Sequence, residues 1–195
     1  MARVVTSATM SLDGFVADPA DGIEELFGWF NNGDVHLETA TPGLDFDLTE
    51  ASAAYWKRWT ESLGCLLVGR RLFDITDGWG GRHPLDVPVV VLSHSVPDGW
   101  PREDAPFEFY DVLEAAVTRS REIAGDGVVG VAAGQVGIQV IDAGLADGVA
   151  IELVPVVLGE GRPYFGHLTN GPVRFSDPEV VPGKDVTHLY FEKQR

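Results

Sequence analysis

The sequence predicts an α/β domain with a central mixed, mostly parallel sheet, helices on its faces and an antiparallel hairpin at the C-terminal end. Two observations support this prediction. Strand-like β-branched runs alternate with helical patterns along most of the 195 residues, and the last two strand-like segments are separated only by a short turn. No linker, repeat or low-complexity segment divides the chain, so we expect a single domain over residues 1–195.

The first half of the chain is expected to form three strands and two helices. PVVVLS is an uninterrupted run, typical of a strand covered on both faces. Apolar side chains recur on one face of LTEASAAYWKRWTESL, and Asp47 and Glu50 are spaced as a capping pair for this helix. A shorter helix begins at RLFDIT and must end in the glycines that follow it. The strands are expected at residues 3–10, 65–68 and 88–93, and the helices at 48–63 and 71–76.

The second half continues this alternation and then changes to antiparallel pairing. Asp111, with Glu114 three residues later, is expected to cap the helix VLEAAVTRSREIA, and Gly144 to close the short helix GQVGIQVIDAG. VRFSDPEVV and VTHLYFEK alternate in polarity and are separated by PGKD, which predicts the hairpin. The strands are expected at residues 107–110, 128–133, 149–158, 173–181 and 186–193, and the helices at 112–124 and 134–144.

The composition is that of a globular protein, and its charge restricts the possible partners. Hydrophobic residues make up 45 % of the chain, and the formal net charge is −16. Nucleic acids and anionic membranes would be repelled by such a charge, so we expect neither as a partner and expect any anion to be bound locally. The N-terminal MARVVTSATM lacks the features of a secretory signal, which predicts a cytoplasmic protein.

Neither a disulfide nor a metal site is expected. Cys65 is the only cysteine and lies in the apolar run CLLV, so we expect a buried thiol rather than a nucleophile. The five histidines show no spacing typical of metal ligands, and no metal is predicted.

The first candidate phosphate site is the end of the strand in CLLVGRRLFD. Gly69 would let the backbone approach a ligand closely, and Arg70 and Arg71 offer fork-shaped donors at the start of a helix. The alternative is that both arginines pair with carboxylates, because the chain contains 30 Asp and Glu. Taken alone, the stretch leaves both interpretations open.

Two further strand ends have suitable chemistry. Ser93 and His94 follow PVVVL, where they could hold a ribose phosphate, although Ser93 and Ser95 could instead form a turn with local side-chain bonds. In VVGVAAGQVGIQVIDAG, Gly134 lies at a strand-to-helix junction that offers backbone N–H groups to a pyrophosphate. Neither the G-x-G-x-x-G pattern nor a P-loop is present. Three such strand ends in one sheet suggest a dinucleotide.

The loop SLDGFVADPADG supplies the candidate catalytic residue. Asp13 follows the first strand, where a carboxylate could bind or protonate a nitrogen heterocycle if partial burial raised its pKa. The alternative is a turn, because Asp-Gly is a common turn pair. Leu12 and Trp79 are expected to line the substrate pocket, with the flexible glycines from Gly78 to Gly81 as its wall or lid.

These segments resemble the reductase-like C-terminal domain of the bacterial riboflavin-biosynthesis deaminase-reductases, the RibD C-terminal domain, and its stand-alone relatives, which share the dihydrofolate reductase fold. The resemblance extends over nearly the whole chain. It rests on TMSLDGFVA (9–17), LLVGRRLFD (66–74), PVVVLSHS (88–95) and AGLADGVAIELVPVVLGEGRPYFG (143–166). The last segment is similar to the family's AGL-x-D followed by P-V-x-L-G-x-G-x-x-x-F.

The resemblance implies an NADPH site. Gly69, Arg70 and Arg71 match the family's Gly-Arg motif, in which an arginine faces the adenosine 2′-phosphate. Ser93 and His94 match the strand end that completes this pocket.

The resemblance also places the pyrophosphate beside residues 133–136. Ala133, Gly134 and Gln135 fall where the family commonly has Gly-Gly-Ala, and Val136 follows them. Ala133 therefore replaces the first glycine. Either this position needs a positive φ or a close approach to the phosphate, so that alanine weakens binding, or Ala133 has ordinary strand geometry and only Gly134 faces the phosphate.

The implied activity is that of an NADPH-dependent reductase similar to dihydrofolate reductase or to 5-amino-6-(5-phosphoribosylamino)uracil reductase. It would transfer a hydride to a C=N or C=O bond of a small polar heterocycle, and Asp13 would orient this substrate. The rival interpretation is a nucleotide-binding sensor or scaffold without turnover, favoured by Ala133 and by the lack of an acid more convincing than Asp13.

Because family members commonly pair, a homodimer is expected. Gly148 after Asp147, where relatives tend to have Glu, is interpreted as a structural change.

Overall fold

The computed structural model describes residues 1–194, and most of its strands join in one sheet. The strands of this sheet are β1 (Arg3–Met10), β5 (Leu63–Gly69), β6 (Val89–Leu92), β7 (Phe107–Tyr110), β8 (Val128–Ala132), β9 (Gly148–Leu153), β11 (Glu179–Pro182) and β12 (Thr187–Glu192). The helices are α1 (Glu50–Ser62), α2 (Arg70–Ile75), α3 (Leu113–Ala124) and α4 (Gln135–Asp142), with short 3₁₀ turns η1 (Gly28–Phe30) and η2 (Asp77–Gly81). Within residues 1–194, no helix is long and apolar enough to cross a membrane.

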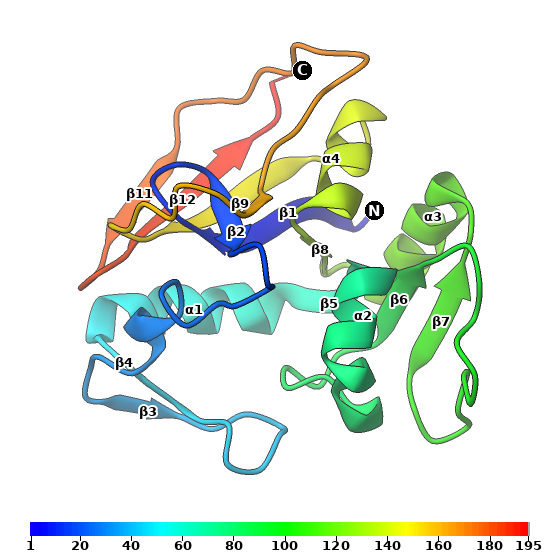
Figure 1. Ribbon diagram of the computed structural model, residues 1–195, viewed down its shortest axis with the longest axis horizontal. Helices are drawn as coiled ribbons and strands as arrows, with labels where there is room; N and C mark the ends of the chain where they lie inside the picture. Colours follow the sequence, from blue (N-terminus) through cyan, green and yellow to red (C-terminus); the bar gives the residue numbers. More distant parts are fainter. Residues whose placement is uncertain (195) are drawn as a thin grey trace.

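The eight strands follow the order β11-β12-β9-β1-β8-β5-β6-β7 (Figure 1). The six strands from β9 to β7 are parallel to one another, whereas β12 is antiparallel to β9 and forms the C-terminal hairpin with β11. The predicted fold class, a mostly parallel α/β sheet with an antiparallel C-terminal hairpin, is therefore confirmed.

The alternation of side chains along the strands gives the sheet two apolar faces. Val4, Leu67 and Val131 belong to the core cluster that α3 and α4 cover. On the opposite face, Val68 and Val91 pack with Phe73 of α2. Figure 1 shows α1 and α2 on one side of the sheet and α3 and α4 on the other. Both faces of the central strands are thus buried, as their uninterrupted apolar runs predict.

Both predicted N-terminal helix caps are wrong, whereas Gly144, with a φ of +72°, closes α4 as predicted. Asp47 belongs to the short strand β4 (Phe46–Leu48), which pairs with β3 (Val35–Leu37), and Thr49 instead accepts the capping bond from the N–H of Ser52. Helix α3 starts after Val112, whose backbone is extended and whose side chain forms no cap. Asp111 therefore lies one residue too early to reach the first turn.

Two predicted strands are longer than the observed ones. The strand expected over 149–158 ends at Leu153, because Pro155 has no N–H for a further ladder bond and the N–H of Val156 bonds to the carbonyl of Val154 instead. The first strand of the hairpin, expected over 173–181, is only β11 at Glu179–Pro182. The segment after β9 instead forms β10 (Arg162–Pro163), which pairs with β2 (Phe15–Ala17) beside the loop that follows β1.

The structural interpretation of the Asp147-Gly148 pair is confirmed. The Asp147 carboxylate accepts hydrogen bonds from the N–H of Val4 at 2.8 Å and from Arg121 at 3.3 Å. A Cβ at Gly148 would lie only 2.8 Å from the carbonyl oxygen of Phe191 on β12. Glycine at this position therefore lets the hairpin pair closely with β9.

The topology gathers the predicted site residues at one edge of the sheet. Because β1, β5, β6 and β8 are parallel, their C-terminal ends lie at the same edge. The loop after β1, the start of α2, the residues after β6 and the start of α4 all follow these ends. Open α/β sheets bind their ligands at such an edge.

Candidate functional site

Gly134 forms an open helix start at this edge. Its φ is +88°, a conformation that favours glycine, and α4 begins at the next residue. A Cβ built on Gly134 would meet only the carbonyl oxygen of Pro163, at 3.9 Å. The first helical bond runs from the N–H of Ile138 to the carbonyl of Gly134, so the N–H groups of residues 135–137 precede it. An anion can use such groups together with the helix dipole.

The structure favours one of the two alternatives for Ala133. This residue does not have a positive φ, and its N–H donates to the carbonyl of Ser7 at 3.2 Å. Its side chain packs against the main core cluster. Ala133 therefore has ordinary geometry with its methyl group turned inward, and Gly134 is the residue that needs glycine.

Gly69 is required by the protein itself. Its backbone is extended, with φ −87° and ψ 160°, so a positive φ is not the reason for glycine. A Cβ on Gly69 would lie 2.9 Å from Cγ2 of Val136, which is buried in the first turn of α4. The glycine thus lets the starts of α2 and α4 approach each other. Gln135, by contrast, is exposed at the start of α4.

Arg70 connects the start of α2 to the loop after β6. Its guanidinium donates at 3.2 Å to both the carbonyl and the hydroxyl oxygen of Ser95, and at 2.7 Å to Asp74. Ser93 Oγ donates to the carbonyl of Ser95 at 2.6 Å, so the expected turn of local bonds is present. His94 is exposed and forms no hydrogen bond within residues 1–194. The structure therefore brings Arg70 to the loop that carries Ser93 and His94, which are three of the four residues expected at the 2′-phosphate side; the fourth, Arg71, has another partner.

Arg71 pairs with a carboxylate, as the alternative interpretation of the two arginines expects. Asp21 accepts hydrogen bonds from Arg71 and also from Arg162 of β10. These bonds, first of all the one from Arg71, lower the pKa of Asp21 to about 2. The carboxylate therefore stays ionised between the two guanidinium groups at any ordinary pH.

The raised pKa that a proton-donating Asp13 would need is not found. Asp13 accepts hydrogen bonds from Ser11 Oγ at 2.6 Å and from the N–H groups of Leu158 and Gly159 at 3.1 and 2.7 Å. These bonds, the one from Ser11 first, lower the pKa of Asp13. The carboxylate is exposed and ionised, and it joins the loop after β1 to the segment after β9. The predicted turn is also present, because the N–H of Gly14 bonds to the carbonyl of Ser11 at 3.0 Å.

The expected pocket wall is only partly brought together. Leu12 is 57 % exposed beside Asp13, and its N–H donates to the carbonyl of Val156 at 2.7 Å. Trp79 instead belongs to the aromatic cluster around Phe73 under α2. The Trp79 ring also packs edge-on against His83, with the ring centroids 4.5 Å apart.

The glycines around Trp79 do not form an open lid. Five consecutive residues, Asp77 to Gly81, have positive φ values between +49° and +105°. Gly78 and Gly81 are buried, and a Cβ on Gly78 would lie 2.8 Å from the rings of Phe73 and Trp100. This turn is therefore a packed left-handed segment, which explains its glycines without a ligand.

Comparisons with known proteins agree on the fold. No protein-family model and no curated protein matches the chain. Among solved structures, a protein from Shewanella sp. PV-4 assigned to riboflavin biosynthesis is 22 % identical with a TM-score of 0.68, and both chains are covered completely. A dihydrofolate reductase from Enterococcus faecalis, complexed with NADP(H), is 15 % identical with a TM-score of 0.58 over 99 % of this chain and 97 % of its own. The chain has the dihydrofolate reductase fold.

The resemblance to riboflavin-biosynthesis reductases is thus confirmed at the level of the fold. The Thermotoga maritima diaminohydroxyphosphoribosylaminopyrimidine deaminase/5-amino-6-(5-phosphoribosylamino)uracil reductase is 15 % identical, with a TM-score of 0.64. The alignment covers 99 % of this chain but only 57 % of that bifunctional protein. The present chain therefore spans little more than half the length of the deaminase-reductase.

Within this dihydrofolate reductase fold, sequence reasoning missed a buried carboxyl group. Glu152 of β9 is 4 % exposed, and burial raises its pKa to about 7. Its neighbours across the sheet are Thr9 on β1 and His188 on β12. The ring nitrogen Nε2 of His188 lies 3.0 Å from Oγ of Ser52, whereas its buried Nδ1 has no partner within residues 1–194. The available signal was a single charged residue inside the apolar run VAIELV.

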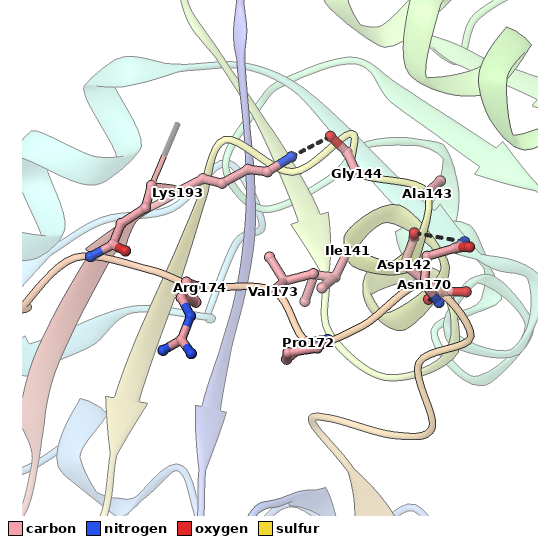
Figure 2. Close-up of a pocket in the computed structure, with 10 residues that line it drawn as sticks. Ile141, Asp142, Ala143, Gly144, Asn170, Pro172, Val173, Arg174 and Lys193 are labelled. Carbon is pink, nitrogen blue, oxygen red and sulfur yellow. Dashed lines mark hydrogen bonds between the residues drawn. The ribbon is translucent and has the colours of Figure 1, made fainter.

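The cavity drawn in Figure 2 is distinct from the site at the strand ends. It has a volume of about 540 Å³ and is lined by residues such as Asp142, Gly144, Asn170 and Lys193. Lys193 Nζ donates to the carbonyl of Gly144 at 2.7 Å. These residues surround the C-terminal end of α4, whereas Gly134 starts the helix at the opposite end. Within residues 1–194, no group of three His, Cys, Asp or Glu is arranged to hold a metal ion.

Proposed function

We propose that this protein is an NADPH-dependent reductase, which transfers a hydride to a C=N or C=O bond of a small polar heterocycle such as a pterin or a ribosylaminopyrimidine. The observation that carries this proposal is the open helix start at Gly134, next to the arginines of α2 at the ligand-binding edge of the sheet. The fold supports it, since it is shared with a dihydrofolate reductase complexed with NADP(H). Bound NADPH would supply the hydride, and the protein would supply orientation and a site poor in water.

Two groups of residues would hold the cofactor. The N–H groups at Gly134, Gln135 and Val136 would bind the pyrophosphate, because a Cβ-free residue leaves the space in front of the helix open. Arg70, oriented by Ser95, would face the 2′-phosphate together with Ser93 and His94. The Arg70 side chain remains open to solvent despite its bonds, since it is 36 % exposed.

The loop after β1 would form the substrate wall. Leu12 and Val157 expose large apolar side chains on two segments that are joined by the bond from Leu12 N–H to the carbonyl of Val156. Asp13 holds the same two segments together through Leu158 and Gly159. In this proposal Asp13 is a positioning residue that shapes the wall, and the proton comes from solvent or from another group.

Turnover is the direct test of a reductase. The consumption of NADPH should be followed by its absorbance with a panel of pterins, dihydropterins and ribosylaminopyrimidinones. Consumption that depends on one of these heterocycles, with the reduced heterocycle identified by mass spectrometry, is the expected result. NADPH binding without turnover for the whole panel would contradict a reductase acting on this class.

A specific observation favours a second candidate, a nucleotide-binding module without turnover. The lowered pKa of Asp13 removes the proton donor that the sequence offered at this edge. Such a module would bind NADPH with the same residues and respond to it through a change of conformation or partner.

A homodimer and a cytoplasmic location stay predictions. Light scattering would check the homodimer.

A further inference from the structure

Asp21 holds two arginines that come from distant parts of the chain. Its Oδ1 accepts hydrogen bonds from Nε of Arg71 and from Nε of Arg162, both at 3.0 Å, and its Oδ2 accepts a second bond from Arg71. The Asp21 side chain is only 17 % exposed, whereas those of Arg71 and Arg162 are 61 % and 44 % exposed. The carboxylate is thus enclosed by two guanidinium groups that remain open to solvent on their other sides.

The segments that carry Arg71 and Arg162 both approach the first turn of α4. Gly69 directly precedes the two arginines of α2, and its Cβ position is 2.9 Å from Val136. Pro163 directly follows Arg162, and its carbonyl oxygen is 3.9 Å from the Cβ position of Gly134. The segments that carry the two arginines therefore flank the helix start that would hold the pyrophosphate.

The two partners of the cluster differ in how they are held. The segment of Arg162 is fixed by Tyr164, which is fully buried and whose hydroxyl lies 3.0 and 2.9 Å from the carbonyl oxygens of Thr6 and Ala150. Asp21 lies in a surface turn closed by the Asp18 side chain, and it has a φ of +69°. The two arginines thus lie on regular secondary structure, Arg71 on α2 and Arg162 on β10, whereas Asp21 lies in a surface turn.

We propose that Arg71 and Arg162 form a site for a phosphate group of the cofactor, and that the Asp21 carboxylate is an internal anion which this phosphate must displace. The inference rests on the proposed function and adds to it a binding residue, Arg162, and a competitor, Asp21. Carboxylate and phosphate oxygens accept the same forked bonds from arginine, so they compete for one position.

Charge supports this assignment. In a chain with a net charge of −16, a phosphate needs local cations. The cluster of Arg71, Arg162 and Asp21 has two positive charges and one negative charge, so one positive charge is not neutralised. The pKa of Asp21, about 2, keeps its carboxylate charged, so the competition does not disappear near neutral pH. Removal of this charge should free both arginines for the ligand.

Asp21→Asn is the appropriate variant, because asparagine has the same shape and tolerates a positive φ well. Asp86→Asn is its matched control. Asp86 also has a positive φ, of +54°, and also accepts two bonds from one arginine, Arg82. It precedes β6, at the opposite edge of the sheet from Ser93. Arg162→Gln tests whether the Arg162 guanidinium binds the phosphate. Its control is Arg58→Gln, which removes an exposed arginine that pairs with Glu179.

The affinities of these variants for NADPH, NADH and inorganic pyrophosphate should be measured by titration calorimetry. Asp21→Asn is expected to bind NADPH roughly two- to fivefold more tightly than the wild type, from the usual strength of such ion pairs. Arg162→Gln should bind it more weakly by a similar factor, and both controls should match the wild type. An equal gain for NADPH and NADH would assign the site to the pyrophosphate, and a gain for NADPH alone to the 2′-phosphate.

Unchanged or weaker NADPH binding by Asp21→Asn would overturn the inference and show that Asp21 is a structural clamp, while the proposed function would stand. If no variant bound either nucleotide, the proposed function would fall instead. In that case the titration with inorganic pyrophosphate tests the anion site without the rest of the cofactor. Tighter pyrophosphate binding by Asp21→Asn supports the site, and equal binding contradicts it.

Discussion

Glu152 lies directly opposite His188 in the antiparallel pair of β9 and β12, and both side chains are buried. Residues opposite each other in such a pair share one face of the sheet, with their Cβ atoms about 5 Å apart. On this face, Tyr55 of α1 stacks on the His188 ring at 4.3 Å. The fold therefore buries the carboxyl group of Glu152, and the ionisation of this group is linked to the stability of the protein.

Glu152→Gln should stabilise the protein at alkaline pH. Burial raises the pKa of Glu152 to about 7, from 4.5, so the folded state keeps a proton that the unfolded state loses between these values. The contribution of Glu152 is fully present below pH 4.5 and is lost as the pH rises to about 7. We compare the free energies of unfolding of Glu152→Gln and the wild type. The difference should favour the variant more at pH 8 than at pH 4, by on the order of 3 kcal/mol.

Urea unfolding at both pH values measures this gain, with the exposed Glu160→Gln as control. The same difference between Glu152→Gln and the wild type at pH 4 and pH 8 would show that Glu152 is not protonated by burial.

Gly69→Ala should destabilise the protein by crowding α4. The new methyl group would lie 2.9 Å from Cγ2 of Val136, although the backbone at Gly69 suits alanine. We expect a loss of about 1–3 kcal/mol, typical of overpacking. In a Val136→Ala background the crowding atom is missing, so the loss should shrink by about 1 kcal/mol or more in a double-mutant cycle. Strict additivity of the two changes would mean that Gly69 serves another purpose.

Gly134→Ala and Ala133→Gly should have different effects. The first places alanine at a φ of +88°, which costs about 1–3 kcal/mol, and turns a methyl group toward the pyrophosphate site. NADPH affinity should therefore fall in this variant. Ala133→Gly should cost only about 0.4–1 kcal/mol and leave affinity unchanged. Melting temperatures and dissociation constants of both variants decide, and tighter NADPH binding by Ala133→Gly would show that alanine does limit the site.

Asp13→Asn should loosen the two loops more than it changes cofactor binding. The carboxylate accepts bonds from both Leu158 and Gly159, and an amide offers only one acceptor oxygen. Hydrogen exchange at these two N–H groups should become faster, while NADPH affinity stays within twofold of the wild type. Exchange that remains as slow as in the wild type would show that Asp13 does not hold these loops.

Local patterns were enough to predict most of the fold and the location of the site. β-branched runs and apolar periodicity locate β1, β5, β6 and β8 correctly. The order of strands and helices implies parallel strands, and these bring Gly69, Ser93 and Gly134 to one edge of the sheet. Glycine and arginine at a strand end therefore indicated both the edge and the chemistry.

What the sequence did not reveal depends on pairs far apart in the chain. Asp21 is 50 residues from Arg71 and 141 from Arg162, so nothing local indicated that their charges meet. The N–H groups that lower the pKa of Asp13 are 145 and 146 residues away. Burial of Glu152 likewise depends on α1 and β12, which no pattern within β9 specifies.

The affinity of the wild-type protein for NADPH compared with NADH, measured by titration calorimetry, tests most directly whether this edge of the sheet is a cofactor site. If Arg70, Ser93 and His94 hold a 2′-phosphate, NADPH should bind more tightly by about 1.5–3 kcal/mol, the range for hydrogen bonds to charged groups, which is roughly 10- to 150-fold in dissociation constant. The preference should be largely lost in Arg70→Gln. Equal affinities of the wild type for the two nucleotides would contradict the assignment of this edge as an NADPH site, and a preference that survives in Arg70→Gln would contradict the role of Arg70.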